Sequence, residues 1–225
     1  MVNLSSPTLK VDFHCHSDAS PDSLSKPVEL IAAARERGLD RLVITDHNTI
    51  RGALRCKDLA PDLIIVGEEV QTTCSEFLAA YVTKEVPRDL EPKEAIKRLR
   101  DQGAFISVSH PFDPHRGWRL RDLLEIIDLV DAIEVFNARC YKPEWNMQAF
   151  AFAEERGVPG TVGSDAHSLY EIGGAGVLLP AFTTADELRR VIGHGQVEGE
   201  LASPLVHLGS RYAKWVKGIF PAQER

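Results

Sequence analysis

The chain has 225 residues, of which 44% are hydrophobic and 26% charged, and its formal net charge is −7. This length can bury a sizeable core and is typical of a single α/β barrel, although two small domains also fit. The acidic balance gives the surface as a whole no reason to bind nucleic acid or a membrane, although a local basic groove stays open.

Targeting signals and disulfide patterns are missing from the sequence. No uninterrupted apolar stretch of about 18 residues occurs, and the first seven residues lack the basic and apolar regions of a signal peptide. The four cysteines, Cys15, Cys56, Cys74 and Cys140, are isolated and form no C-x-x-C pair. We therefore expect reduced thiols, no membrane partner and a cytoplasmic location.

Short apolar runs alternate with stretches of helical periodicity along the chain. Strands are expected at 9–13, 41–45, 63–66, 77–82, 105–108, 132–136 and 160–162. Helices are expected at 28–37, 91–102, 120–127, 144–156 and 185–192. Ser25 and Pro27 start the first helix and Gly38 ends it, whereas Thr184 and Glu187 form a capping box at the start of the last.

This alternation predicts a mainly parallel sheet with crossover helices, and both an open doubly wound sheet and a closed barrel fit it. Neither a G-x-G-x-x-G nor a P-loop pattern follows the first strand. The tail from about Ala202 is less regular and carries a basic and aromatic cluster, made of Arg211, Tyr212, Lys214, Trp215 and Lys217. We interpret this cluster as a packing helix with solvated lysines, the alternative being contact with a phosphate chain.

Side chains that bind metals recur where the expected strands end. They are His14, His16, Asp46, His47, Glu68, Glu69, His110, Asp165 and His167. Residues i and i+2 of an extended segment point the same way, so each x-separated pair can face one cation. In α/β barrels this edge of the sheet carries the functional site. Nitrogen and oxygen ligands without thiolates favour a catalytic metal site over a structural one.

Other interpretations apply to single residues. A lone histidine at a strand end is ordinarily structural. Asp12 and Asp46 are expected to orient ligands, and only one of Glu68 and Glu69 should face the site. Asp22 fits either a turn or a ligand from the first loop. A shared site is favoured because five separate strand ends carry histidine, aspartate or glutamate.

These residues resemble the polymerase and histidinol phosphatase (PHP) superfamily of metal-dependent phosphoesterases. The matching segments occur in order over about residues 9–180: His14-Cys15-His16-Ser17, Ser20-Pro21-Asp22-Ser23, Thr45-Asp46-His47-Asn48, Gly67-Glu68-Glu69-Val70, Ser109-His110-Pro111 and Gly163-Ser164-Asp165-Ala166-His167. Residues 134–139 look like the small stand-alone branch.

The resemblance implies an α/β fold, a distorted (β/α)7 barrel, as one domain over 1–225 with residues 181–225 forming a helix and tail packed on it. It also implies two to three divalent ions, of zinc, manganese or iron. Their ligands would be His14, His16, Asp22, His47, Glu69, His110, Asp165 and His167. One departure is that Glu76 lies near a position where members often have histidine.

The implied chemistry is phosphoester hydrolysis by a hydroxide formed at clustered cations, with Asp165 and His167 as catalytic residues at the metals. His115 is a candidate proton donor to the leaving oxygen, the alternative being a loop histidine without a role. Arg116, Arg139 and Lys142 are candidates for holding the phosphate, the alternative for each arginine being an exposed side chain without a role.

Three functions stay open at this point. The first is a phosphatase or phosphodiesterase acting on a small phosphorylated metabolite or nucleotide. The second, not favoured, is an exonuclease acting on single-stranded nucleic acid ends, which needs a basic groove. The third is a non-catalytic, metal-stabilised partner module. The sequence does not identify the substrate, the native metals or the oligomeric state.

Overall fold

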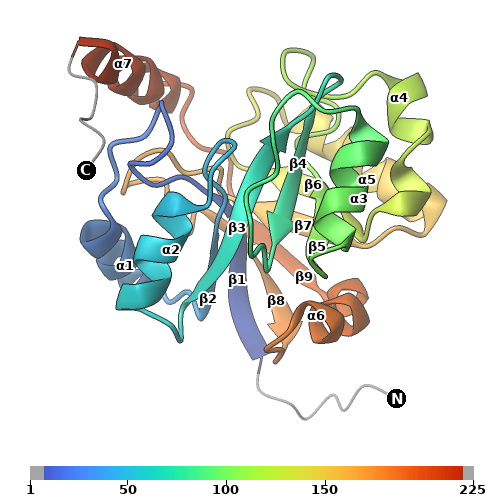
Figure 1. The fold of residues 1–225 in the computed structure, drawn as a ribbon, viewed down its shortest axis with the longest axis horizontal. Coiled ribbons are helices and arrows are strands. Elements are labelled where there is room, and N and C mark those ends of the chain that lie inside the picture. Colours follow the sequence, from blue (N-terminus) through green and yellow to red (C-terminus); the bar gives the residue numbers. More distant parts are fainter. Residues whose placement is uncertain (1–7, 220–225) are drawn as a thin grey trace.

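Seven strands of one curved sheet form the centre of the computed structural model, which describes residues 8–219 (Figure 1). The strands are β1 (Thr8–Cys15), β2 (Arg41–Ile44), β3 (Ile64–Gln71), β4 (Glu76–Ala80), β5 (Phe105–Val108), β6 (Ala132–Asn137) and β7 (Gly160–Gly163). Their order in the sheet follows the chain, and β8 (Ala175–Pro180) and β9 (Gln196–Gly199) extend it beyond β1. The expected strand positions are confirmed, and β8 and β9 were missed.

The sheet closes into a barrel only at one end. There the Asp165 amide donates to the His14 carbonyl (2.8 Å), and the His16 amide donates to the Ala166 carbonyl (2.9 Å). The first half of β1 pairs instead with β8, through a register that begins at Thr8 and Pro180. Because β8 occupies that part of the β1 edge, β7 reaches β1 only near its carboxyl end. The expected distorted barrel is therefore confirmed, with its closed end where the polar segments after the strands lie.

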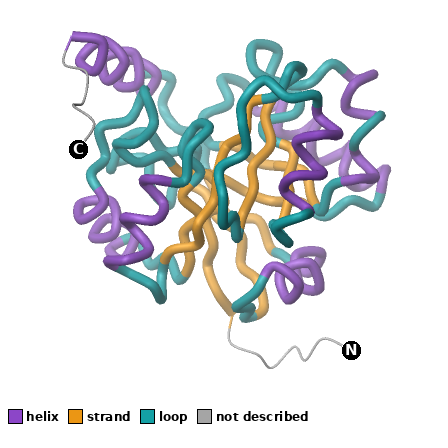
Figure 2. The backbone as a smooth tube through the Cα atoms, viewed as in Figure 1, coloured by secondary structure: helices purple, strands orange, loops and turns teal. Residues whose placement is uncertain are grey.

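Helices surround the strands (Figure 2). They are α1 (Pro27–Glu36), α2 (Arg51–Leu59), α3 (Pro92–Arg100), α4 (Leu120–Leu124), α5 (Pro143–Arg156), α6 (Ala185–Val191) and α7 (Val206–Ile219). Helix α4 stops three residues before the expected end, and a 3-10 turn follows at Ile127–Leu129. Helix α2 was not predicted, and it has no side-chain N-cap to mark its start.

The sheet is less parallel than expected. Strand β4 runs antiparallel to both β3 and β5. Only residues 72–75 connect β3 to β4, and a parallel neighbour needs a crossover of a dozen or more residues. The hairpin is therefore forced by connection length, and it carries Glu76 to the rim of the barrel beside the end of β3.

The tail, expected to be less regular, forms α7, which lies at one side of the molecule (Figure 1). Ala213 is its one buried residue among those described. Its lysines are not merely solvated as expected, because Lys214 Nζ lies 3.2 Å from Asp22 Oδ2 and Lys217 Nζ donates to the carbonyls of Asp18 and Ser20. Polar contacts with the first loop therefore hold this helix.

A hydrophobic core fixes the strands that present the polar edge. Phe13 and Phe105 pack with ring centroids 6.2 Å apart, and Phe77 and Trp118 with centroids 4.9 Å apart. On the other side, Cys15 packs in a second buried cluster with Leu30 and Ile44, on the face of β1 opposite to the flanking histidines. Among residues 8–219, no helix is long and apolar enough for a membrane crossing. The first seven residues, which concern the signal-peptide prediction, lie outside the described range.

Candidate metal centre

The eight expected ligands come from separate segments and meet at the closed end of the barrel. His14 and His16 lie at the end of β1, Asp22 in the loop that follows, His47 after β2, and Glu69 near the end of β3. His110 follows β5, and Asp165 and His167 follow β7. Seven of the eight are buried, and His47 is 23% exposed in its side chain. The structure thus brings the two ends of the motif series together.

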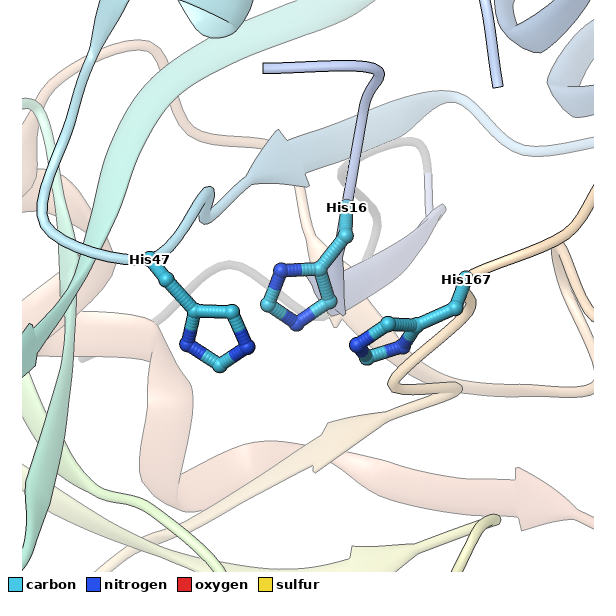
Figure 3. A group of neighbouring side chains, drawn as sticks. All are labelled: His16, His47 and His167. Atoms are coloured by element: carbon cyan, nitrogen blue, oxygen red, sulfur yellow. The ribbon is translucent and has the colours of Figure 1, made fainter. Parts of the chain in front are cut away.

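Three imidazoles face one another at the outer side of the group (Figure 3). The ring centroid of His16 lies 4.6 Å from that of His47 and 4.1 Å from that of His167. Each of the three residues has one ring nitrogen that lies within 4.8 Å of a ring nitrogen of the other two. This spacing allows one cation to contact all three rings.

A second group lies deeper. The Nε2 atoms of His14 and His16 are 3.1 Å apart. Glu69 reaches them with Oε1 3.4 Å from His14 Nε2 and Oε2 3.5 Å from His16 Nε2. Asp165 Oδ1 lies 3.5 Å from the first nitrogen and 3.4 Å from the second. The two carboxylates therefore enclose the pair of imidazoles.

Acceptors outside the cluster fix the tautomers of three histidines. His14 Nδ1 lies 3.0 Å from Glu134 Oε1, and His167 Nδ1 lies 2.7 Å from the Asp165 carbonyl oxygen. Each Nδ1 must carry the proton, because neither acceptor can donate. His16 Nδ1 lies 3.0 Å from Ser20 Oγ, whose own hydrogen goes to Asp46 Oδ1 at 2.7 Å. All three Nε2 atoms consequently point into the cluster, where each offers a lone pair when its ring is neutral.

The cluster holds more inward acceptors than donors, which tests whether a metal fits. Among the ligand carboxylates, the buried oxygens without a hydrogen-bond donor in residues 8–219 are Asp22 Oδ1, Glu69 Oε2 and Asp165 Oδ1. Buried acceptors of this kind carry a desolvation cost and repel the neighbouring Nε2 lone pairs. Divalent cations would satisfy all of them at once. The residues present therefore fit a metal centre built from nitrogen and oxygen ligands.

Without an ion, the acidic and basic groups of the cluster shift one another strongly. Burial disfavours the charged form of Asp165, but His14 and Arg116 outweigh it and hold its pKa well below the usual value. Burial likewise opposes charging of His14, yet Asp165, Glu69 and Glu134 raise its pKa well above the usual value. For His16, burial and then the neighbouring His167 lower the pKa to about 3. This lowering favours the neutral form of His16, which is the form that binds a metal.

Backbone strain accompanies two of these positions. Asp165 has φ +54° and His110 has φ +24°, values that side-chain-bearing residues rarely adopt. Both residues directly follow buried barrel strands. Such outliers persist where the surrounding structure holds them, and they gather at functional sites.

The candidate phosphate-binding cations differ from one another. Arg116 Nη1 donates to Asp165 Oδ2 at 2.7 Å, while its Nη2 is buried without a hydrogen-bond partner among the described residues. Arg139 is buried at 4% exposure, so the alternative of an exposed arginine is wrong for it. Its Nε lies 3.1 Å from Glu171 Oε1, and its Nη2 donates to Ser210 Oγ at 2.6 Å. Arg139 therefore links the β7 loop to α7.

An open cleft of about 1140 Å³ leads to the cluster. His47, Glu76, His167, Arg116 and Arg139 line it toward the barrel. Its outer wall contains the expected His115 and Lys142 together with Tyr141, Trp145, His207, Ser210, Arg211 and Lys214. Helix α7 consequently contributes Arg211 and Lys214 to the same cleft as the candidate metal ligands, a position that suits the alternative interpretation of its basic and aromatic cluster.

Two acidic residues belong to the site but received no role in the sequence analysis. Glu134 lies in β6, where it accepts from His14, from the His110 amide (2.7 Å) and from Asn137 Nδ2 (3.1 Å). A single charged residue in an otherwise apolar strand was the signal that could have revealed it. Glu76 approaches His47 and His110 from β4. Glu69 faces the cluster, whereas Glu68 accepts from the Val86 amide (3.0 Å) on the other side of β3.

Comparisons with known proteins agree with this geometry. The PHP domain family model matches residues 12–102, and the PHP-associated family model matches residues 143–197. An uncharacterized protein of Methanocaldococcus jannaschii is 34% identical over 172 residues, which are 74% of this chain and 69% of that protein.

Solved structures show the same fold at low identity. A two-domain protein from Bacteroides vulgatus, which contains a predicted PHP-like metal-dependent phosphoesterase, superposes with a TM-score of 0.72 at 21% identity, covering 87% of this chain. This chain spans 66% of that protein's length. A lesion-specific endonuclease from Pyrococcus furiosus superposes with a TM-score of 0.64 at 15% identity, over 88% of this chain and 60% of its own.

Proposed function

This chain belongs to the PHP family, and we propose that it hydrolyses phosphoester bonds of a small phosphorylated metabolite or nucleotide with the help of two to three divalent ions. Zinc, manganese and iron suit the mixed nitrogen and oxygen ligands. The proposal keeps the cytoplasmic location and the single domain over 1–225 that the sequence predicts, and it leaves the oligomeric state open.

One observation carries the proposal. Residues from both ends of the chain turn histidine Nε2 atoms and carboxylate oxygens that lack a hydrogen-bond donor toward the closed end of the barrel. This end of the barrel opens into a cleft lined by cationic side chains. A structural metal site would be closed on all sides, whereas a catalytic one needs room for water and substrate. The cleft supplies that room.

The roles divide among the residues as follows. The eight proposed ligands hold the ions, and among them Asp165, which contacts the proposed phosphate-binding Arg116, and His167 are the proposed catalytic residues. Bound divalent ions supply a water of lowered pKa and offset charge on the phosphoryl oxygens. Arg116 keeps Asp165 in place with Nη1 and offers the unpartnered Nη2 to a phosphate oxygen.

The outer wall of the cleft has two further roles in the proposal. His115 delivers a proton to the leaving oxygen. Lys142 binds the substrate as an exposed cation, whereas Arg139 shapes the phosphate pocket from its buried position between Glu171 and Ser210. The ion pair of Arg139 explains why its removal should affect the β7 loop as well as substrate binding.

The direct test is hydrolysis of p-nitrophenyl phosphate and bis(p-nitrophenyl) phosphate by protein stripped of metal and then supplied with Mn²⁺ or Zn²⁺. We expect turnover only with metal, and its loss in His16→Ala. His194→Ala, at an exposed position outside the cleft, is the matched control and should keep full turnover. Equal turnover of the stripped protein, the reconstituted protein and His16→Ala would refute the proposal. Stoichiometric metal without turnover would favour the non-catalytic module.

A second candidate is an exonuclease acting on single-stranded nucleic acid ends. The observation that favours it is that α7 adds Arg211 and Lys214 to the cleft beside Lys142 and the aromatic Tyr141 and Trp145. Binding of a short oligonucleotide should then weaken steeply as salt is raised from 50 to 200 mM. A flat salt dependence, or no oligonucleotide cleavage alongside rapid hydrolysis of small phosphoesters, would remove this candidate.

A further inference from the structure

Glu76 is the first residue of β4, and the β3–β4 hairpin carries it to the mouth of the barrel. The hairpin pairs Glu76 with Gln71, the last residue of β3, and pairs Leu78 with Glu69, so Glu76 lies diagonally across from Glu69 on the same face of the hairpin. Its side chain is 18% exposed and lines the cleft. The residue therefore reaches the candidate metal centre from a strand that none of the eight expected ligands occupies.

The carboxylate of Glu76 faces imidazoles on two sides. Oε1 lies 3.7 Å from His47 Nδ1, and Oε2 lies 3.3 Å from His110 Nε2. Glu69 approaches the same two rings, with Oε2 2.9 Å from His47 Nδ1 and Oε1 3.3 Å from His110 Nε2. Each of the two carboxylates thus lies close to both imidazoles.

The surroundings of Glu76 argue against an ordinary surface ion pair. Within residues 8–219, its carboxylate pairs with the two imidazoles and with no lysine or arginine. Ligand atoms of His47, Glu69 and Glu76 all lie within 4.8 Å of one another, which brings two carboxylates of like charge together. Like charges at this distance repel unless a cation lies between them.

The ligand chemistry of this point differs from that of the imidazole group in Figure 3. His16, His47 and His167 offer three neutral nitrogens, which suit zinc. The point beside β4 offers two carboxylates that together balance the charge of one divalent ion. Carboxylate oxygens suit harder ions such as Mn²⁺.

We propose that Glu76 is a metal ligand, which with Glu69 and the His47 and His110 rings forms a carboxylate-rich position that raises the preference of this site for Mn²⁺ relative to Zn²⁺. The inference rests on the proposed function, because it assigns a ninth ligand to the same metal centre. Glu76 lies near a position where members of the family often have histidine, and the proposal is that this difference affects which ion binds.

The test compares Glu76→Gln and Glu76→His with the wild type and with Glu155→Gln, a control at an exposed position of α5. Metal-free protein is dialysed against equal concentrations of Mn²⁺ and Zn²⁺, and bound ions are counted by elemental analysis. Mn²⁺ affinity is measured separately by electron paramagnetic resonance titration. Circular dichroism verifies that each variant is folded, and glutamine preserves the shape of the side chain.

We expect Glu76→Gln to weaken binding of one Mn²⁺ by at least about tenfold, the lower end of what loss of a ligand's supporting partner costs. Glu76→His should lower the ratio of Mn²⁺ to Zn²⁺ while keeping the number of ions, and Glu155→Gln should match the wild type. Unchanged ion number and Mn²⁺ affinity in Glu76→Gln would overturn the inference alone, provided that the wild type binds metal and hydrolyses aryl phosphate. A wild type that binds no metal would overturn the proposed function as well.

Discussion

Glu134 tests whether a hydrogen bond from outside the metal centre fixes the tautomer of a ligand histidine, because Glu134 contacts His14 and is not itself one of the proposed ligands. Glu134 Oε1 accepts a hydrogen bond from His14 Nδ1 at 3.0 Å. Its Oε2 accepts hydrogen bonds from the His110 amide at 2.7 Å and from Asn137 Nδ2 at 3.1 Å. Two acceptor oxygens therefore satisfy three buried donors. The variant Glu134→Gln keeps the shape of the side chain but replaces one of these oxygens with a donor.

Either orientation of the new amide has a cost. If its nitrogen faces His14, the ring must carry its proton on Nε2, the atom that otherwise points at His16 and the proposed ions. If its nitrogen faces the other side, the His110 amide loses its acceptor, and a buried unpaired donor costs about 1–3 kcal/mol. Loss of such an outer partner typically reduces metal affinity about 10–100-fold, which corresponds to about 1.4–2.8 kcal/mol.

The assay is competition for Zn²⁺ or Mn²⁺ between the protein and a chromophoric chelator, at a pH where the chelator is fully deprotonated. Glu155→Gln removes the same charge from the surface of α5 and should leave the affinity within twofold of the wild type. A Glu134→Gln protein that is folded and binds metal as tightly as the wild type would refute the argument that Glu134 fixes the His14 tautomer.

Three further predictions concern the residues that support the site and the fold. An alanine Cβ at Gly163 would lie 2.3 Å from His14 Cβ and 2.7 Å from Glu134 Oε1, so Gly163→Ala should lose bound metal and about 1–3 kcal/mol of stability. Gly193 has open space around it, so the control Gly193→Ala should lose neither; calorimetry measures the stability and elemental analysis the metal. Burial, with Glu85 nearby, raises the pKa of Glu68 from 4.5 to about 8. The folded protein therefore binds this proton more tightly than the unfolded chain, and stability should fall by up to about 5 kcal/mol as pH rises from about 4.5 to about 8. Urea titrations should find this fall weakened in Glu68→Gln, and an equal pH slope in both proteins would contradict the assignment. Thr184 Oγ1 caps α6 by accepting from the Glu187 amide at 3.2 Å, so Thr184→Ala should lose about 1 kcal/mol and Thr184→Ser should regain most of it in the same titrations.

Local pattern was sufficient to predict the strands that carry the site. The run ending at Phe13 and the run ending at Val162 are apolar because both are buried in the barrel, and polar residues begin where each strand emerges. The capping residues Thr184 and Glu187 located α6 because their side chains accept from the amides of Glu187 and Thr183 at the helix start. Apolar runs and helix caps depend on residues that are close in sequence, so they can be recognised without the structure.

The missed features depend on distant partners. Strand β8 exists because it pairs with β1 from Thr8 to Val11, a contact between residues more than 160 positions apart. The direction of β4 followed from the shortness of the connection before it, which the alternation of strands and helices concealed. Helix α7 reaches the cleft through Lys214 and Ser210, whose partners Asp22 and Arg139 belong to other segments.

The candidate site divides in the same way. The identity of the polar residues was visible because each follows a strand, and their convergence followed from the closure of a barrel. The buried pairing of Arg139 with Glu171 was not visible, because a charged residue after a strand is ordinarily exposed. The supporting role of Glu134 was likewise hidden, since it depends on which face of β6 meets β1.

The central claim is that imidazoles and carboxylates from both ends of the chain share cations at the closed end of the barrel. Anomalous scattering from crystals grown with Mn²⁺ or Zn²⁺ tests it most directly. The account predicts more than one anomalous peak, with one lying within coordination distance of ring nitrogens of both His16 and His167. Crystals that keep this arrangement of side chains yet give no peak between them, at metal concentrations that saturate ordinary binding sites, would contradict it.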